Sequence, residues 1–265
     1  GGGLVVVGDG GAARVLTSLD GLPDTRVHAV VETSDGLWVG TEGGAALVRR
    51  DRAPAVARTA ADVPVRAFLA GATGIYLGTW GAGVLRLIDA EASPSPVAAA
   101  GQGKHVTALL THGGRVHAGY ADGPVARLEG TTLRPLAGGP ARAQALGVHG
   151  ERLVAGGIEG IDRLGAGGGS AASIASVDAR GFAVASDGRL LVATYGSGLL
   201  ASTSATGTAL KAEPGVPRWV RGVAARGATR CAATTEGLFV DEGAGFRRVP
   251  LGGPPSNDVT AIASA

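Results

Sequence analysis

The strongest constraint on the fold is a short sequence pattern that returns about every 38 residues. Its clearest copy, residues 22–44, reads LPDTRVHAVVETSDGLWVGTEGG. It predicts a turn, a strand over 26–32, a tight turn at 34–36 and a second strand over 37–41. A Glu-Gly-Gly turn then leads into a third apolar strand. Repeats of this length are typical of propellers, solenoids and arrays.

The start of the first strand in each copy has an apolar or small residue, a polar residue, and then Ala or Gly. This pattern occurs seven times, in steps of 38, 41, 37, 36, 41 and 39 residues, beginning at Val27, Val65, Val106, Ala143, Ala179, Val220 and Val259. No stretch shows the apolar periodicity of an amphipathic helix. The pattern therefore predicts an all-β fold, a seven-bladed β-propeller with four-stranded blades, as a single domain over residues 1–265.

The two ends of the chain predict how the seventh blade is built. Residues 258–265 have the pattern of an innermost strand, and residues 4–17 supply two strands without an innermost one. The stretch from Val259 through both ends to Val27 is about one strand shorter than the other steps. We therefore expect a closing blade made from both termini and short of one strand. Two explanations stay open: the N-terminal strands move inward, or a segment is missing from the chain.

Composition argues against several classes of protein. The chain has 24 basic and 22 acidic residues, a net charge of +2, and no basic run with interleaved aromatic residues, so nucleic acid is not an expected partner. The single cysteine, Cys231, rules out an intrachain disulfide and takes the place of Leu37, which predicts a buried, inert thiol. The five histidines have no metal-ligand spacing, and we expect neither a metal nor another cofactor.

No apolar run approaches the ~18 residues of a membrane-spanning helix, so no transmembrane segment is expected. The sequence has no signal-peptide pattern, contains no Met and begins with three glycines. We interpret this beginning as that of a processed or excised chain.

The stretch LPDTRVHAVVETSDGLWVGTEGG resembles the repeat of two-component regulator propellers, the seven-bladed sensor domains outside many bacterial histidine kinases. The match is close over residues 22–44 and recognisable at Gly78-Thr79, and it weakens where Trp38 is replaced by Tyr76, His117 or Val154. The resemblance implies a bacterial, exported module, periplasmic or extracellular, that binds a ligand or a partner. It does not extend to the membrane span and kinase that follow such propellers.

In such a propeller, the turns after the second strands share a face with the starts of the inner strands. A candidate binding site is expected on this face, made of Trp80, Tyr120, Tyr195, Trp219, Arg26, Arg142, Arg218, Glu42 and Glu236. The strand starts add Lys104, His105, Asp178 and Asp258. Aromatic residues among charges are typical of interfaces, and predict a protein partner or a small anionic or polar ligand. The alternative is that these aromatic side chains only cover neighbouring blades.

The polar residue at the start of each inner strand predicts a ring of side chains around the axial channel. The ring consists of His28, Arg66, Thr107, Gln144, Arg180, Arg221 and Thr260. Three arginines there suit an anionic ligand. The alternative is a solvated channel whose arginines pair with acids of the turns, namely Glu42, Asp122, Glu159 and Glu236.

The sequence contains no complete catalytic set. Ser197 lacks the spacing of a nucleophile motif, and His117 takes the place of Trp38, which favours packing. We therefore expect a non-catalytic binding protein. The alternative is a lyase or hydrolase with a His and a Glu on the same face, for which Glu42 with His28 or Glu236 is the candidate pair.

Overall fold

A computed structural model describes residues 2–7, 13–49, 55–71, 73–100, 103–165, 172–250 and 258–259 of the chain. These residues form short β-strands and one 3-10 turn, η1 (Ser18–Asp20), so the all-β prediction is confirmed for them. The chain divides into two compact units. One holds Gly1–Val97 with Lys104–Val106, and the other holds Ala98–Gly103 with Thr107–Ser264. Each unit is described by itself.

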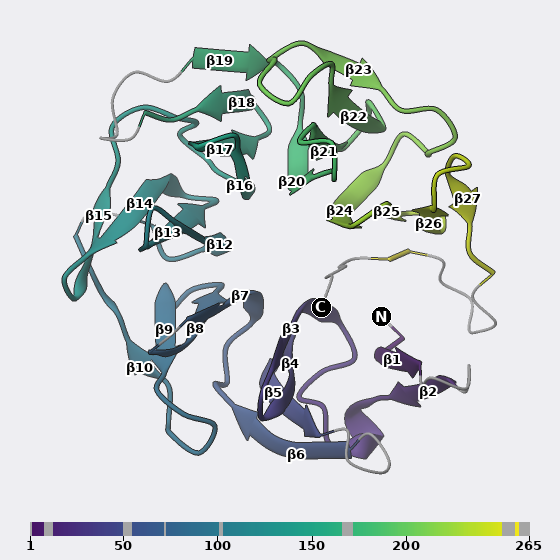
Figure 1. The fold of residues 1–265 in the computed structure, drawn as a ribbon. Helices are drawn as coiled ribbons and strands as arrows, with labels where there is room; N and C mark the ends of the chain where they lie inside the picture. The colour runs from purple at the N-terminus through teal and green to yellow at the C-terminus, as the bar shows by residue number, and fades with distance from the viewer. Residues whose placement is uncertain are drawn as a thin grey trace. The chain divides into compact units, whose positions relative to one another are not determined.

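The first unit contains a hairpin and two four-stranded antiparallel sheets (Figure 1). The hairpin pairs β1 (Leu4–Val7) with β2 (Ala13–Leu16). The first sheet runs in chain order through β3 (Val27–Thr33), β4 (Gly36–Thr41), β5 (Gly44–Arg49) and β6 (Ala55–Ala60). The second runs through β7 (Val65–Gly71), β8 (Gly74–Thr79), β9 (Val84–Leu87) and β10 (Ser95–Pro96).

Strand β4 explains why the strands are continuously apolar, because both of its faces are buried. Leu37 and Val39 pack with Leu4 and Leu16 of the hairpin. Trp38, on the opposite face, packs into a second cluster that includes residues of β8 and β9. Successive side chains of a strand point to opposite faces, so a sheet covered on both sides needs apolar residues at every position.

The second unit contains one five-stranded and three four-stranded sheets among its described residues (Figure 1). The first sheet consists of β11 (Ala98–Ala99), β12 (Val106–His112), β13 (Arg115–Tyr120), β14 (Gly123–Glu129) and β15 (Thr132–Pro135). The second consists of β16 (Ala145–His149), β17 (Arg152–Gly157), β18 (Gly160–Arg163) and β19 (Ala172–Ala175). The third consists of β20 (Ala179–Val184), β21 (Leu190–Thr194), β22 (Leu199–Ser202) and β23 (Leu210–Ala212). The fourth consists of β24 (Val220–Arg226), β25 (Thr229–Thr234), β26 (Gly237–Asp241) and β27 (Arg247–Arg248).

The five-stranded sheet differs from the predicted four-stranded pattern. The extra strand, β11, pairs in parallel with β15 through Ala98 and Ala99. The segment before β12 thus runs along the edge of β15 and satisfies backbone groups that an edge strand leaves open. The other sheets of four strands follow the prediction.

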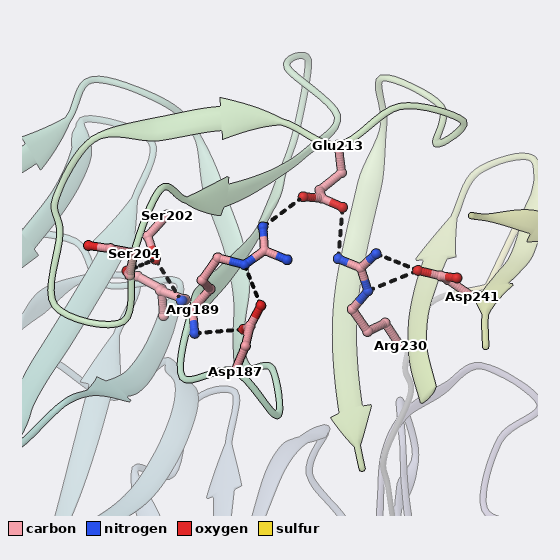
Figure 2. A network of polar contacts seen from close by, with 8 residues as sticks. Asp187, Arg189, Ser202, Ser204, Glu213, Arg230 and Asp241 are labelled. Carbon is pink, nitrogen blue, oxygen red and sulfur yellow. Dashed lines mark hydrogen bonds and ion pairs between the residues drawn. The ribbon is translucent and has the colours of Figure 1, made fainter. Parts of the chain in front are cut away.

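A chain of ion pairs links the last two sheets of the second unit (Figure 2). Arg189 contacts Asp187 at 2.6 Å and Glu213 at 3.3 Å. Glu213 also contacts Arg230 at 2.7 Å, and Arg230 binds Asp241 at the end of β26. Because Glu213 follows β23 and Arg230 lies in β25, this chain of alternating charges joins the two neighbouring sheets.

The prediction for the closing blade lies partly outside the described residues. Hairpin β1–β2 is present, but residues 260–265, the bulk of the expected innermost strand, are not described. Val259 donates its backbone N–H to the carbonyl of Thr234 at 3.0 Å. The blade count and the missing strand therefore stay predictions.

Candidate functional site

Four inner strands begin with a β-bulge at the polar residue that the sequence pattern singled out. In β3, Val27 pairs with Thr41 and Ala29 with Gly40, so His28 is the additional residue. The same shift occurs at Arg66, Arg180 and Arg221. A bulge leaves one residue outside the ladder and redirects its side chain. The bulge therefore gives these four polar side chains equivalent places in their repeats.

In the first unit, His28 and Arg66 share one carboxylate. His28 Nε2 lies 2.7 Å from Glu42 Oε2, and Arg66 donates from Nη2 to the same oxygen at 2.8 Å. Arg66 Nη1 also lies 3.1 Å from His28 Nδ1. A guanidinium can only donate, so Nδ1 is the acceptor and the proton of neutral His28 is on Nε2.

The charges of this triad follow from burial and proximity. Burial and the Arg66 charge lower the pKa of His28, so its neutral form is favoured. Burial opposes ionisation of Glu42, but the hydrogen bond from His28 and the Arg66 charge lower the pKa of this carboxyl overall. The result is a neutral imidazole between a carboxylate and a guanidinium.

A five-residue turn occurs once in each unit, as Thr79-Trp-Gly-Ala-Gly83 and Thr194-Tyr-Gly-Ser-Gly198. In both, the Thr hydroxyl donates to the last Gly carbonyl, at 2.7 Å and 2.6 Å. The two Gly amides donate to the carbonyl of Lys104 in one unit and of Arg218 in the other. This shared backbone geometry places the aromatic residue after Thr at the same position in both repeats.

The aromatic residue of each turn pairs with a ring that precedes the next inner strand. Trp80 forms an isolated bridge with His105, and their ring centroids are 4.6 Å apart. Tyr195 forms the equivalent bridge with Trp219, at 4.5 Å and an interplanar angle of 50°. Trp80, Tyr195 and Trp219 are each 40% exposed. The structure therefore brings Tyr195 and Trp219 together and keeps all three rings accessible.

Arginine side chains lie over these rings, and three of the four come from the bulges. The Arg66 guanidinium is 5.3 Å from the Trp80 centroid. In the second unit, Arg180 and Arg221 lie 5.2 Å and 5.9 Å from the Tyr195 centroid, and Arg218 lies 5.9 Å from that of Trp219. Such contacts hold an aromatic ring by cation–π attraction. Two aromatic–arginine clusters result, one around Trp80 and one around Tyr195 and Trp219.

The ring arginines have carboxylate partners, as in the second interpretation of the channel. Arg66 pairs with Glu42, Arg180 with Asp178 at 2.7 Å, and Arg221 with Asp258 at 2.7 Å. Only Glu42 comes from the predicted turns. Asp178 and Asp258 precede the inner strands. The sequence signal for each is its position, which is two residues before Arg180 for Asp178 and one residue before Val259 for Asp258. All three arginines are thus paired with carboxylates, which is the arrangement of the second interpretation.

Tyr120 is a clear error of the sequence prediction, because it is fully buried. It follows Gly119 as Thr79 follows Gly78, so it matches the buried Thr and not Trp80. Successive residues of a strand point to opposite faces, and a shift of one position moves a side chain from the surface to the core. Burial raises the pKa of Tyr120 to about 12.

The remaining predicted residues have other partners or are exposed. Arg26 pairs with Asp24 at 3.2 Å, and Arg142 and Glu236 are exposed. Thr107 donates its hydroxyl to the carbonyl of Ala143, and Gln144 donates its backbone N–H to Gly156. Thr260 lies outside the described residues. The ring of seven therefore stays a prediction.

The described residues contain no group of three or more His, Cys, Asp or Glu side chains placed to hold a metal ion. Within the same residues, no helix has the length and apolar character needed to cross a membrane. Cys231 is half-buried, and burial raises the pKa of its thiol, which is the direction expected for an unreactive cysteine.

Comparison with known families supports the resemblance seen in the sequence. Residues 21–43 match the two component regulator propeller family. They cover the stretch that carried the resemblance, which is thereby confirmed. No curated protein matches the chain in sequence.

Solved structures resemble the chain over most of its length. The extracellular domain of a hybrid two component system from B. thetaiotaomicron is similar with a TM-score of 0.75 and 13% identity, covering 93% of this chain and 37% of that one. The WD40 beta propeller domain of Doa1 has a TM-score of 0.69 and 12% identity, covering 85% and 83%. Virginiamycin B lyase from Staphylococcus aureus has a TM-score of 0.69 and 12% identity, covering 87% and 84%.

These similarities show the fold, and the chain is an all-β propeller. This chain spans little more than a third of the B. thetaiotaomicron domain. Sequence identities this low carry no activity from one protein to another.

Proposed function

We propose that this protein is a non-catalytic recognition module that binds a partner protein or a small polar or anionic ligand through its half-exposed aromatic residues. The observation that carries the proposal is the repeated arrangement of Trp80 and Tyr195. Each lies in a Thr-aromatic-Gly-x-Gly turn, against a second ring and beneath a guanidinium, and is 40% exposed. Rings fixed in this way lose little freedom on binding, which favours affinity.

We also propose that the module senses its ligand outside the cytoplasm, in the periplasm or the extracellular space. The support is the match to the two component regulator propeller family and the similarity to the extracellular domain of a hybrid two component system. Coupling to a kinase is not part of this proposal.

The proposal is tested by screening ligands with thermal unfolding. A panel of small carboxylates, amines, amides and short peptides is tested for compounds that raise the melting temperature. Binding compounds should lose their effect in Trp80→Ala or Trp219→Ala, because a ligand that binds only the native state stabilises it in proportion to its affinity. Ile88→Ala is the control, since Ile88 is an exposed apolar residue outside both clusters. Compounds that stabilise parent and both Trp variants equally would place the site elsewhere.

A second candidate function rests on the contact between His28 and Glu42. His28 Nε2 lies 2.7 Å from Glu42 Oε2, so these two residues could form the acid–base pair that the lyase or hydrolase hypothesis requires. Both ring nitrogens of His28 are engaged, however, by Glu42 and by Arg66. His28 could accept a substrate proton only after Arg66 moved away, which makes this candidate the weaker one. A substrate turned over by the parent and not by His28→Gln, with Trp80→Ala still active, would favour it.

For the architecture, we propose a single domain with seven blades, whose closing blade takes its inner strand from residues 258–265 and is one strand short. The support is the seven-fold sequence repeat together with the hydrogen bond from Val259 to Thr234. An experimental structure with six or eight blades would contradict it.

A further inference from the structure

The cluster around Tyr195 and Trp219 carries more positive than negative charge. Three guanidiniums lie over its two rings, those of Arg180, Arg218 and Arg221. Two carboxylates, those of Asp178 and Asp258, pair with these guanidiniums. Arg180 and Arg221 are thereby neutralised by carboxylates, and the excess charge belongs to Arg218.

Arg218 is also anchored in place. Its Nε donates to the carbonyl of Gly196 at 3.1 Å, which ties the side chain to the turn that carries Tyr195. Within the described part of the chain, its two terminal nitrogens have no hydrogen-bond partner, and the residue is exposed. A guanidinium fork in this state binds carboxylates with two parallel hydrogen bonds.

The cluster around Trp80 also has a charge-compensated bulge arginine, but it has no arginine counterpart of Arg218. Its bulge arginine, Arg66, shares Glu42 with His28, so its charge is compensated. The residue equivalent to Arg218 is Lys104. Its carbonyl accepts hydrogen bonds from the two Gly amides of the Trp80 turn, as the carbonyl of Arg218 does from those of the Tyr195 turn. A lysine is a point charge without the planar fork that matches a carboxylate.

We infer that Arg218, Trp219 and Tyr195 form a site for a carboxylate attached to a flat apolar group. The carboxylate would take the free edge of Arg218, and the flat group would lie on the exposed rings. An aromatic acid and a peptide that ends in an aromatic residue share this chemistry. The inference rests on the proposed function and names the ligand class of one of its two clusters.

The test uses Trp219 as the reporter in a Trp80→Phe variant. The other tryptophan, Trp38, is fully buried and supplies a constant background. Emission is titrated with phenylacetate and with its uncharged analogue phenylacetamide, at matched ionic strength. We expect saturable binding of the acid, and binding of the amide weaker by about tenfold or more, since hydrogen bonds to charged groups contribute about 1.5–3 kcal/mol.

The variant Arg218→Gln should bind acid and amide equally. Arg152→Gln should keep the preference, because Arg152 is an exposed arginine of the same unit outside the cluster. Circular dichroism and melting establish that each variant is folded. N-acetylphenylalanine and a tripeptide ending in phenylalanine, each against its C-terminal amide, distinguish a free acid from a peptide end.

Three outcomes would overturn the inference: no saturable response to any acid, equal affinity for acid and amide, or a preference that survives Arg218→Gln. These outcomes are separable from failure of the proposed function. If acid and amide bind equally, and Trp219→Ala abolishes the rise in melting temperature that both produce, the aromatic surface still binds and only the carboxylate assignment is lost.

Discussion

His117 takes the place that Trp38 has in the opening repeat, and its burial determines its charge. Its Nδ1 donates to the carbonyl of Arg115 at 3.0 Å, and burial lowers its pKa to about 4. In the unfolded chain a histidine binds a proton near pH 6.5. The native state gains stability from neutral His117 above pH 6.5 and loses it as the pH falls toward 4, by about 3 kcal/mol in total. Urea unfolding of parent and His117→Phe between pH 7 and 4 measures this difference.

His117→Phe should lose less stability on acidification, because it has no proton to bind at this place. If His117→Phe and the parent lose equal stability between pH 7 and 4, His117 is not the group responsible.

The buried hydroxyl of Tyr120 predicts an unusual substitution pattern. Among the described residues this oxygen has no hydrogen-bond partner. Tyr120→Phe should therefore leave the free energy of unfolding unchanged or raise it, because a buried polar group without a partner costs about 1–3 kcal/mol. Tyr120→Thr, which introduces the residue of the equivalent positions, should lower it by about 3 kcal/mol through the cavity that it leaves. A destabilised Tyr120→Phe in chemical denaturation would mean that the hydroxyl has a partner.

At the scale of single elements, the ion-pair chain between the last two sheets of the second unit is expected to stabilise their packing (Figure 2). Asp241 is almost fully buried, and although burial opposes its ionisation, Arg230 and the amides of Gly243 and Gly245 lower its pKa. Arg230→Met would leave this carboxylate without its guanidinium partner. We expect a loss of roughly 2–4 kcal/mol in the free energy of unfolding. This is slightly less than the loss on breaking a fully buried pair, because Arg230 is partly exposed.

Arg247→Met is the matched control in the same sheet. Arg247 pairs with Glu242 at 2.7 Å, but both side chains are more than half exposed. Exposed pairs contribute about 0–1 kcal/mol, so this variant should melt close to the parent. Equal effects of the two substitutions would show that the chain of charges does not stabilise the contact.

The repeat predicted the middle strands of the sheets well. Strands such as β4, β8 and β21 are buried on both faces, so their sequences are continuously apolar or small. The repeat could not show the bulges, since a bulge changes the pairing of strands without changing the composition. The pairing of Arg180 with Asp178 and of Arg221 with Asp258 depends on those bulges, and the sequence analysis looked for the acids in the turns. Tyr120 was misplaced because it directly follows Gly119 and so takes the buried position of Thr79, one residue before the position of Trp80.

At the scale of the whole molecule, each repeat depends on the next. In the described repeats, a sheet buries apolar side chains on both faces, as Leu191 and Val192 of β21 illustrate by packing into different clusters. A repeat without a neighbour would expose one of these faces to water, and a propeller avoids this by closing. The C-terminal residues are therefore expected to contribute more to the stability of the fold than their small number indicates.

Deletion of residues 258–265 tests that expectation. Val259 donates to the carbonyl of Thr234 at 3.0 Å, just as Ala143 donates to that of Tyr120 at 2.9 Å where another inner strand begins. If residues 258–265 form the seventh inner strand, the deletion leaves its neighbours uncovered and should lower the melting temperature by many degrees. Asp258→Asn weakens its partly exposed pair with Arg221, and exposed pairs contribute about 0–1 kcal/mol. If the truncated chain has the same melting temperature as Asp258→Asn, the C-terminus stabilises the protein through its ion pair and supplies no closing strand.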